Sequence, residues 1–397
     1  MKYVIVILDG ASGWPIDALG GKTTLQAADT PNLDALAKSG TMGLALTLPG
    51  GAEPSSSAAC TSILGYDPVA DYVGRGAIEA ASMGITLASD QVALRLNLVT
   101  VRDGTMASYS AGNIATQESA AIVTDIASDL DDGTFTLYPG VAYRHILVVT
   151  GHPELLGTTF TPPHDISDRH IEPFLPKGPG AELLLDYMGR ARVLLDNSGV
   201  NRCRTAGGGS PATDVWPFWP GVAPRELTPF AEMRGLSGAL TSGVDLLNGL
   251  AVLVGMDRLD IAGVTGDSGN DYAAQTEGAL SALRNHDVVV IHIESPDEEG
   301  HDGDVAGKVA AIEAIDREVI ARLRGYAHGH ELRILAMPDH PTPIEIKTHV
   351  GEPVPFVLSG PGVGHNRGWR FDELSAEKTG LMLDPGHRVM DLLLESS

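Results

Sequence analysis

The chain begins MKYVIVILDG (residues 1–10), and residues 2–8 of this stretch are almost all β-branched or otherwise apolar. Such a run, closed by Asp9 and Gly10, predicts a buried β-strand that ends at Asp9. Strands that are apolar along their whole length are typical of parallel sheets covered by helices on both faces. The first ten residues therefore favour an α/β fold.

The segments that follow alternate between helix and strand. Thr30 followed by Pro31 predicts a helix that is capped by Thr30 and runs to Lys38, and residues 41–48 predict the next strand. Towards the other end of the chain the apolar patterns predict strands at residues 286–293, 331–337 and 354–358, and a helix at residues 305–324. This alternation predicts a mostly parallel sheet between two helical layers.

The middle of the chain does not continue this alternation of helices and strands. Residues from about 80 to 225 contain many short segments and turn signals, and Trp216 and Trp219 lie in a stretch broken by prolines. We interpret the chain as one α/β core formed by residues 1–80 and 226–397, with a second, smaller domain inserted at residues 81–225.

Composition limits the classes of function. The chain has 397 residues, 43% of them apolar, and a net charge of −24, which argues against a nucleic-acid partner. The apolar runs are too short to cross a bilayer, and the N-terminus does not resemble a secretory signal. The two cysteines, Cys60 and Cys203, form no disulfide framework. We expect a cytoplasmic protein that contacts neither nucleic acid nor membrane.

Ligand-type side chains follow three of the predicted strands. Asp297 and His301 come after one strand, four residues apart, so a helical turn would direct both to one point. The whole set comprises Asp9, Asp297, His301, Asp339, His340 and His349. The carboxyl ends of neighbouring parallel strands are where such sheets place their sites, and carboxylate and imidazole groups bind zinc, manganese and similar ions. The sequence therefore predicts a divalent-metal centre.

A serine cluster supplies candidate nucleophiles. Ser55, Ser56 and Ser57 precede a helix-like segment that ends at Gly65. A helix N-terminus and a nearby metal ion both favour the ionised form of a hydroxyl, which can attack phosphorus. The spacing alone does not choose among the three, and an ordinary serine-rich turn is the alternative.

Taken together, several passages resemble the cofactor-independent phosphoglycerate mutases of the archaeal type, in the alkaline phosphatase superfamily, and their bacterial relatives described as homoserine kinases. The matching passages are LGGKTTLQAADTPNLDALAKSG, LGYDP, GRGAIEA, YSAGNI, LYPGVAYRH, PPHDIS, ESPDEEGH, PDHPTP, KTH and EPVPF. The resemblance implies an alkaline-phosphatase-like three-layer core and an inserted α+β domain that carries substrate contacts.

The resemblance also implies two adjacent divalent ions, Mn²⁺ or Zn²⁺ with Mg²⁺ as the alternative. Asp9, Asp339, His340 and the nucleophilic serine would hold one ion, and Asp297, His301 and His349 the other. Counted back from LGYDP, the nucleophile falls on Ser56. A small phosphorylated metabolite would transfer its phosphoryl group to Ser56, and then to its own second hydroxyl (a mutase), to another acceptor, or to water (a phosphatase).

Six further residues are candidate substrate contacts, and structural ion pairs or loop caps are the alternative for them: Arg75, Arg95, Arg144, His145, His164 and Asp165. The chain departs from the family pattern at Ser57, Cys60, Ser108, Asn113 and Gln275. These departures remove acidic and basic groups while the metal ligands remain. They leave a phosphatase, a phosphotransferase or a non-catalytic metal-binding homologue as alternatives, and the sequence gives no oligomeric state.

Overall fold

The computed structural model describes residues 1–52, 54–223, 227–366 and 369–395. The chain divides into two compact units. Met1–Tyr72 and Glu226–Ser397 form the first unit, and Val73–Arg225 form the second, which is inserted in the chain order. The expected boundary between residues 80 and 81 falls inside helix α4 (Arg75–Ser82), which packs on strands of the second unit.

An eight-stranded sheet forms the centre of the first unit, in the order β13-β2-β12-β11-β1-β10-β8-β9. The strands are β1 (Lys2–Leu8), β2 (Thr41–Ala45), β8 (Gly238–Thr241), β9 (Asp257–Arg258), β10 (Val288–Ile293), β11 (Leu332–Met337), β12 (Val354–Ser359) and β13 (Met382–Leu383). β1 pairs in parallel with both β10 and β11, whereas β12 is antiparallel to β11 and β2. The predicted, mostly parallel sheet is confirmed.

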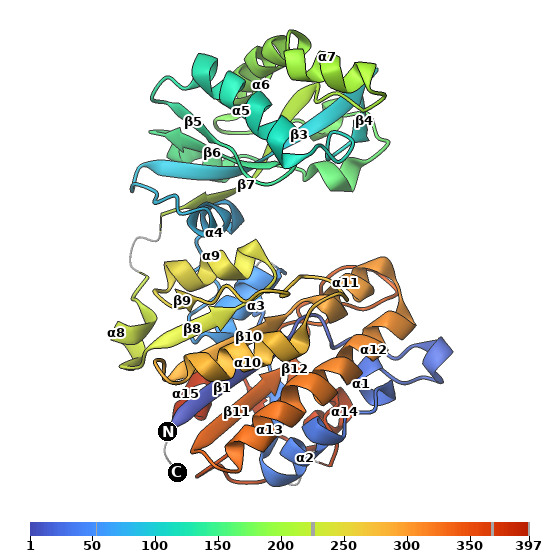
Figure 1. Cartoon of the computed structure of the whole chain (residues 1–397), viewed down its shortest axis with the longest axis vertical. Helices are drawn as coiled ribbons and strands as arrows, with labels where there is room; N and C mark the ends of the chain where they lie inside the picture. The colour runs from blue at the N-terminus through green and yellow to red at the C-terminus, as the bar shows by residue number, and fades with distance from the viewer. Residues whose placement is uncertain (53, 224–226, 367–368, 396–397) are drawn as a thin grey trace. The chain divides into compact units, whose positions relative to one another are not determined.

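Helices cover both faces of this sheet. Val4, Val6 and Leu8 of β1 face a core shared with α2 (Pro31–Ser39), α10 (Tyr272–Ala282) and α12 (Val305–Ile315). On the other side lie α3 (Ser56–Ile63), α9 (Asp245–Leu253) and α15 (Arg388–Leu394) (Figure 1). The remaining helices of the unit are α1 (Thr24–Ala27), α8 (Phe230–Arg234), α11 (Ser295–Asp302), α13 (Ala321–Ala327) and α14 (Glu373–Lys378). The predicted three-layer arrangement is confirmed.

The start of α2 corrects one detail of the sequence prediction. Thr30 occupies the N-cap position, but its side chain makes no capping hydrogen bond. Asp316 accepts from the backbone N–H groups of Asn32 (3.1 Å) and Leu33 (2.7 Å) instead. Asp316 begins a π-helical turn, Asp316–Ile320, between α12 and α13. The helix predicted at residues 305–324 therefore contains a widened turn whose carboxylate caps α2.

The second unit is built on an antiparallel sheet around the long strand β3. Its strands are β3 (Gln91–Arg102), β4 (Thr105–Ser108), β5 (Phe135–Tyr138), β6 (Arg144–Thr150) and β7 (Asp214–Val222). Its longer helices are α5 (Thr116–Leu130), α6 (Ala181–Asp196) and α7 (Gly199–Ala206). Leu94, Leu96 and Leu98 face the core formed with α5 and α6, while Ala93 packs in a smaller cluster with Ala80 of α4. Alternate residues of β3 point to opposite faces of the sheet, so these two sets of side chains pack against different helices. An antiparallel sheet covered by helices confirms the expected α+β character of this unit.

Strand β7 crosses the stretch in which prolines suggested an irregular segment. Pro217 and Pro220 lie within it, opposite Leu96 and Leu94 of β3. Among the described strands β7 pairs only with β3, so it is an edge strand, where a residue without an N–H is tolerated. The indole Nε1 of buried Trp216 donates to the carbonyl of Thr161 at 2.8 Å.

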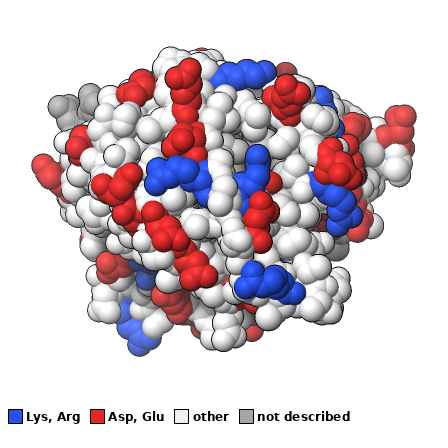
Figure 2. Space-filling model, turned by 90° about the horizontal axis from the view of Figure 1, so that it is seen from above, with Lys and Arg blue, Asp and Glu red and all other residues white. Residues whose placement is uncertain are grey.

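Two surface properties bear on partners. None of the helices formed by the described residues is long and apolar enough to cross a membrane. On the face of the second unit drawn in Figure 2, Asp and Glu side chains lie among Lys and Arg, and the residues described there form no broad basic surface.

Candidate metal centre and nucleophile

Three adjacent strands bring the predicted ligands to one edge of the central sheet. Asp9 directly follows β1, and Asp339 and His340 follow β11. After β10 the chain turns into α11, which carries Asp297 and His301 one turn apart. Because β1, β10 and β11 are parallel, their carboxyl ends lie together.

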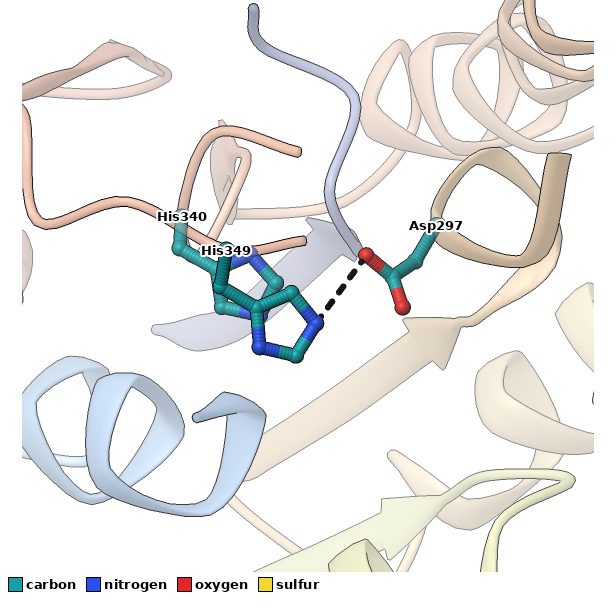
Figure 3. Close-up of side chains that lie close together, drawn as sticks. All are labelled: Asp297, His340 and His349. Carbon is teal, nitrogen blue, oxygen red and sulfur yellow. Dashed lines mark ion pairs between the residues drawn. The ribbon is translucent and has the colours of Figure 1, made fainter. Parts of the chain in front are cut away.

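Asp297 is the centre of a group of histidines. Its Oδ2 lies 3.0 Å from His301 Nε2, and its Oδ1 lies 3.5 Å from His349 Nε2. The two Nε2 atoms are 2.9 Å apart. Figure 3 shows the rings of His340 and His349, with centroids 4.1 Å apart, on one side of Asp297. One ligand atom each from Asp297, His340 and His349 fall within 4.8 Å of one another.

A second group adjoins the first through His340. Its Nε2 lies 3.2 Å from Asp339 Oδ2, 3.5 Å from Asp9 Oδ1 and 3.1 Å from the hydroxyl of Ser56. Asp9, Asp339 and His340 are fully buried, and Oδ1 of Asp9 has no hydrogen-bond partner among the residues that the structure describes. An unpartnered carboxylate oxygen is costly to bury, so this donor set fits a cation.

Two histidines are oriented by backbone carbonyls. Nδ1 of His301 lies 2.9 Å from the carbonyl of Lys347, and Nδ1 of His349 lies 3.1 Å from that of Pro54. A carbonyl only accepts, so each Nδ1 must carry the proton. Nε2 of each ring then faces Asp297 and donates a hydrogen bond to it while no metal ion is bound. Once that proton leaves, the Nε2 lone pair points in the same direction, which is the arrangement of metal-binding histidines.

The pKa values of the candidate ligands are shifted because several charged groups lie close together and are buried away from water. Burial and the charges of Asp339 and Asp297 raise the pKa of Asp9 well above its usual range. Burial opposes ionisation of Asp297 too, but hydrogen bonds from His301 and His349 outweigh it and hold its pKa well below the usual range. The hydrogen bond to Asp297 raises the pKa of His301 to about 9. Such perturbed groups cluster at functional sites.

Sequence reasoning missed the residues that support these ligands. Thr342 Oγ1 donates to Asp297 Oδ1, and the N–H of Gly10 donates to Asp339 Oδ1 at 3.0 Å. The Nζ of buried Lys308 donates to the carbonyls of Thr342 (2.7 Å) and Ser12 (3.2 Å), which ties together the loops after β1 and β11. Their only signal in the sequence was proximity to the ligands.

His292 and Glu294 were missed as well. His292 lies near the end of β10, and Glu294 directly follows the strand as the N-cap of α11. One ligand atom from each falls within 4.8 Å of the other and of a ligand atom of Asp9. Alternation along a strand could have signalled them, because His292 interrupts an otherwise apolar run.

The three serines have different surroundings. Ser55 is the N-cap of α3 and accepts from the N–H of Ala58 at 3.4 Å. The hydroxyl of Ser57 lies 2.9 Å from that of Tyr72. Of the three, only Ser56 contacts a candidate metal ligand. The structure thus distinguishes residues that the spacing could not.

In the second unit, Arg75 and Arg95 share one carboxylate. Glu79 Oε1 lies 2.9 Å from Arg75 Nε, and Glu79 Oε2 lies 2.5 Å from Arg95 Nη1. The guanidinium of Arg75 also stacks on Trp219, 3.8 Å from the ring centroid. The ion pairs that the sequence left as the alternative are present, and they hold two cations beside aromatic rings.

The other expected substrate contacts divide into two groups. The ring of His164 lies 5.5 Å from that of Trp219, and the charges of Arg75 and Arg95 help to lower its pKa, after burial. Asp165 is exposed beside His164, and Arg144 is exposed near Tyr143. His145, by contrast, is 1% exposed and accepts from the N–H of Gly140, so it cannot touch a ligand in this conformation.

The residues that depart from the family pattern have structural contacts. Cys60 is buried with its Sγ 3.9 Å from Asp339 Oδ2. Gln275 is buried and donates to the carbonyl of His292 at 2.9 Å. Ser108 accepts from the N–H of Gly112 at 2.9 Å, in a turn where Asn113 has φ 53°.

Comparisons with known proteins agree with the motifs. A family model described as 2,3-bisphosphoglycerate-independent phosphoglycerate mutase matches residues 37–201. A protein of that name from Methanothrix thermoacetophila is 44% identical over 396 residues, covering 99% of this chain and 100% of its own. Another from Methanosarcina barkeri is 41% identical over 401 residues, covering 100% of both.

Solved structures show the same relationship. A protein from Pyrococcus horikoshii superposes with a TM-score of 0.82 at 29% identity, covering 100% of this chain and 98% of that one. A cofactor-independent phosphoglycerate mutase from Thermoplasma acidophilum gives a TM-score of 0.68 at 29% identity, covering 99% of each chain. The resemblance seen in the sequence motifs is confirmed, and the chain belongs to the family of 2,3-bisphosphoglycerate-independent phosphoglycerate mutases.

Proposed function

We propose that this enzyme interconverts 3-phosphoglycerate and 2-phosphoglycerate through a phosphoserine at Ser56. One observation carries the proposal: the Ser56 hydroxyl lies at the N-terminus of α3, 3.1 Å from His340 Nε2, and the same Nε2 lies 3.2 Å from buried Asp339 and 3.5 Å from buried Asp9. The helix N-terminus favours the ionised oxygen and a transferring phosphoryl group.

Two groups of residues would hold divalent ions. Asp9, Asp339, His340 and Ser56 form one set, and Asp297, His301 and His349 form the other. Two observations support this assignment: Nδ1 of His301 and of His349 faces a carbonyl, which leaves Nε2 to bind an ion once it is deprotonated, and Asp9 Oδ1 has no hydrogen-bond partner within the described part of the chain. Mixed imidazole and carboxylate ligands favour Mn²⁺ or Zn²⁺ over Mg²⁺. When bound, the ions would stabilise negative charge on the Ser56 oxygen and on the phosphoryl group.

In the transfer, the Oγ of Ser56 replaces the substrate's ester oxygen on phosphorus. The Ser56 hydroxyl gives up its proton, its Oγ forms a bond to phosphorus, and the ester bond to the substrate oxygen breaks. That oxygen takes up a proton. In the reverse sense, the other hydroxyl of the same glycerate attacks phospho-Ser56, and the serine hydroxyl is restored.

For the substrate, the cations of the second unit are the candidates. We assign Arg75, Arg144 and His164 to the carboxylate and phosphate of phosphoglycerate, with Asp165 orienting His164. Arg95 is buried and paired with Glu79, so it supports Arg75 through that carboxylate and does not touch the substrate itself. Guanidinium groups suit these anions, and Arg75 is fixed by both Glu79 and Trp219. His145 is omitted because it is buried.

The test is activity of metal-stripped protein on 3-phosphoglycerate with Mn²⁺, Zn²⁺ or Mg²⁺ restored, followed by phosphorus NMR. We expect 2-phosphoglycerate with Mn²⁺ or Zn²⁺. Ser56→Ala should abolish turnover, and Ser57→Ala, the matched control one residue away, should keep most of it. Full activity of Ser56→Ala would overturn the nucleophile assignment. Inorganic phosphate with no isomer would overturn the mutase activity and point to a phosphatase.

A further inference from the structure

Strand β7 of the second unit is irregular at Trp219. Leu94 of β3 pairs with Pro220. The next residue of β3, Arg95, pairs with Phe218, so Trp219 is an extra residue on β7 and forms a β-bulge. A bulge redirects the side chain that it carries, and bulges are frequent next to active sites.

The backbone at this bulge adopts an unusual conformation. Trp219 has φ 48°, in the left-handed region that glycine or asparagine usually occupies. Among the non-glycine residues with positive φ in the described ranges, Trp219 has the bulkiest side chain. For a bulky residue this conformation is strained, and strained residues cluster at functional sites. The contacts of the redirected indole therefore indicate what it does.

The indole supports the guanidinium of Arg75. The guanidinium carbon lies 3.8 Å from the ring centroid of Trp219. Nε of the same group donates to Glu79 Oε1 at 2.9 Å, so Glu79 fixes one edge of the guanidinium and Trp219 fixes its face. The Arg75 side chain is 28% exposed, and its Nη groups form no hydrogen bond with any residue that the structure describes. An anion can therefore reach the Nη groups of Arg75.

Two glycines allow the start of α4 to approach the bulge. A Cβ on Gly76 would lie 2.5 Å from the carbonyl oxygen of Trp219, and one on Gly74 would lie 2.4 Å from that of Pro220. Arg75 lies between these glycines. Backbone packing as well as the side-chain contact therefore holds Arg75 beside the indole.

We propose that Trp219 is a positioning residue for the substrate, because its redirected indole holds Arg75 in the orientation that binds the carboxylate or phosphate of phosphoglycerate. Trp219 acts through Arg75 and does not touch the reacting atoms. This inference rests on the proposed function, since it takes Arg75 to be a substrate contact. A guanidinium that binds the substrate and the transition state equally lowers KM without changing kcat.

The experiment is a double-mutant cycle, measured as steady-state kinetics of the metal-loaded full chain on 3-phosphoglycerate. Trp219→Leu should raise KM roughly 3–30-fold, the range that the free energy of a cation–π contact spans, and should change kcat less than about twofold. Trp219→Phe keeps an aromatic face and should recover part of this loss. In the Arg75→Gln background, Trp219→Leu should have almost no further effect, because the contact that it removes is already absent.

Phe174→Leu is the matched control. Arg169 stacks on Phe174 in the same unit, with its guanidinium carbon 4.3 Å from the ring centroid, and neither residue is a candidate substrate contact. This variant should keep the native KM, and circular dichroism should show native helix content in every variant.

Three outcomes would contradict the inference in different ways. A native KM in folded Trp219→Leu, or an equal rise in KM from this change in the native and Arg75→Gln backgrounds, would overturn the positioning role and leave the proposed function standing. A native KM in Arg75→Gln would overturn the assignment of Arg75 to the substrate, and the inference with it. Absence of turnover by the native chain would overturn the proposed function itself.

Discussion

Single residues behind the candidate ligands determine how closely these ligands can approach. Gly10 has φ +60°, and a Cβ there would lie 2.4 Å from Asp297 Oδ1 and 2.6 Å from Thr342 Oγ1. Glycine is therefore required at this position for two reasons: the backbone conformation favours it, and a side chain would clash with Asp297. Thr342 uses the same space to donate to Asp297.

Gly10→Ala should weaken metal binding about 10–100-fold, the size of effect seen when groups supporting a ligand are disturbed. The reason is that the methyl group must displace Asp297 or Thr342. Calorimetric titration with Mn²⁺ measures the affinity. Gly20→Ala is the matched control, since Gly20 has φ +67° but no atom within 4 Å of a Cβ. An equal loss of affinity in both variants would show that backbone strain alone, and not contact with Asp297, is responsible.

At the scale of elements, the helices are joined by a few buried polar contacts. The π-helical turn Asp316–Ile320 directs a carboxylate to the first N–H groups of α2. In the second unit, α4 is joined to β3 through Glu79, which pairs with Arg95 on the strand and Arg75 on the helix. Each contact can be removed by one substitution.

Asp316→Ala should lower the free energy of unfolding by about 1–2 kcal/mol, because it removes the cap of α2. Thr30→Val should cost almost nothing, since the buried Thr30 hydroxyl has no hydrogen-bond partner in the described ranges of the chain. Urea unfolding of the two variants side by side measures this difference. A larger loss of stability in Thr30→Val than in Asp316→Ala would show that the Thr30 side chain caps α2, as the sequence predicted.

Glu79 should make the second unit sensitive to acid. Burial acts to raise its pKa, but Arg95 and Arg75 outweigh burial and hold the pKa below its ordinary value. Its contribution is therefore complete above the unfolded pKa, near 4.5, and is lost as the pH falls through the lower folded pKa.

Glu79→Gln should lose about 3 kcal/mol at pH 7, because it leaves two cations beside one neutral amide, and should show less further loss between pH 5 and 3. Urea unfolding, monitored by tryptophan fluorescence at several pH values between 3 and 7, measures both the loss of stability at pH 7 and its dependence on pH. Glu182→Gln, exposed on α6, is the control and should match the native chain. Parallel acid profiles for Glu79→Gln and the native chain would contradict the ion-pair argument.

The elements differ in how far the sequence could predict them. β1 and β10 were predictable because both of their faces are buried, so apolar residues run without a break. β7 was missed because Pro217 and Pro220 signal a break, and only tertiary structure shows that it is an edge strand. The Asp316 cap was missed because it is distant in sequence from α2.

The candidate site shows the same contrast between residues that a local pattern reveals and residues that only the tertiary structure reveals. Asp9, Asp297 and Asp339 could be predicted because adjacent parallel strands must end at one edge of the sheet. Spacing alone could not single out Ser56 from Ser55 and Ser57, because what distinguishes it is the position of His340 in the fold. His292 interrupts the apolar run of β10, but the sequence does not show that its Nε2 lies 2.7 Å from Asp9.

At the scale of the whole molecule, the two units have separate hydrophobic cores and separate sets of chemical groups. Every candidate metal ligand named here lies in the first unit, and the cations assigned to the substrate lie in the second. A ligand stabilises the part of a protein that it binds.

Metal loading should therefore slow hydrogen exchange in the first unit and leave the core of the second nearly unchanged. At a free Mn²⁺ concentration 100 times the dissociation constant, the gain is about 2.7 kcal/mol per ion. Hydrogen-exchange mass spectrometry can compare β1, β10 and β11 with β3 and β6 in one experiment. Equal protection of β3 and β6 would show that the ions also bind to, or act through, the second unit.

The most direct test of the central proposal is detection of the phosphorylated serine. Metal-loaded enzyme is mixed with 3-phosphoglycerate, quenched in acid within milliseconds, digested and analysed by tandem mass spectrometry. We expect a phosphoryl group on Ser56, absent from Ser55 and Ser57, that appears with substrate and disappears when metal is withheld. Turnover with unmodified Ser56 at every quench time, or a phosphoryl group on another residue, would contradict the proposal.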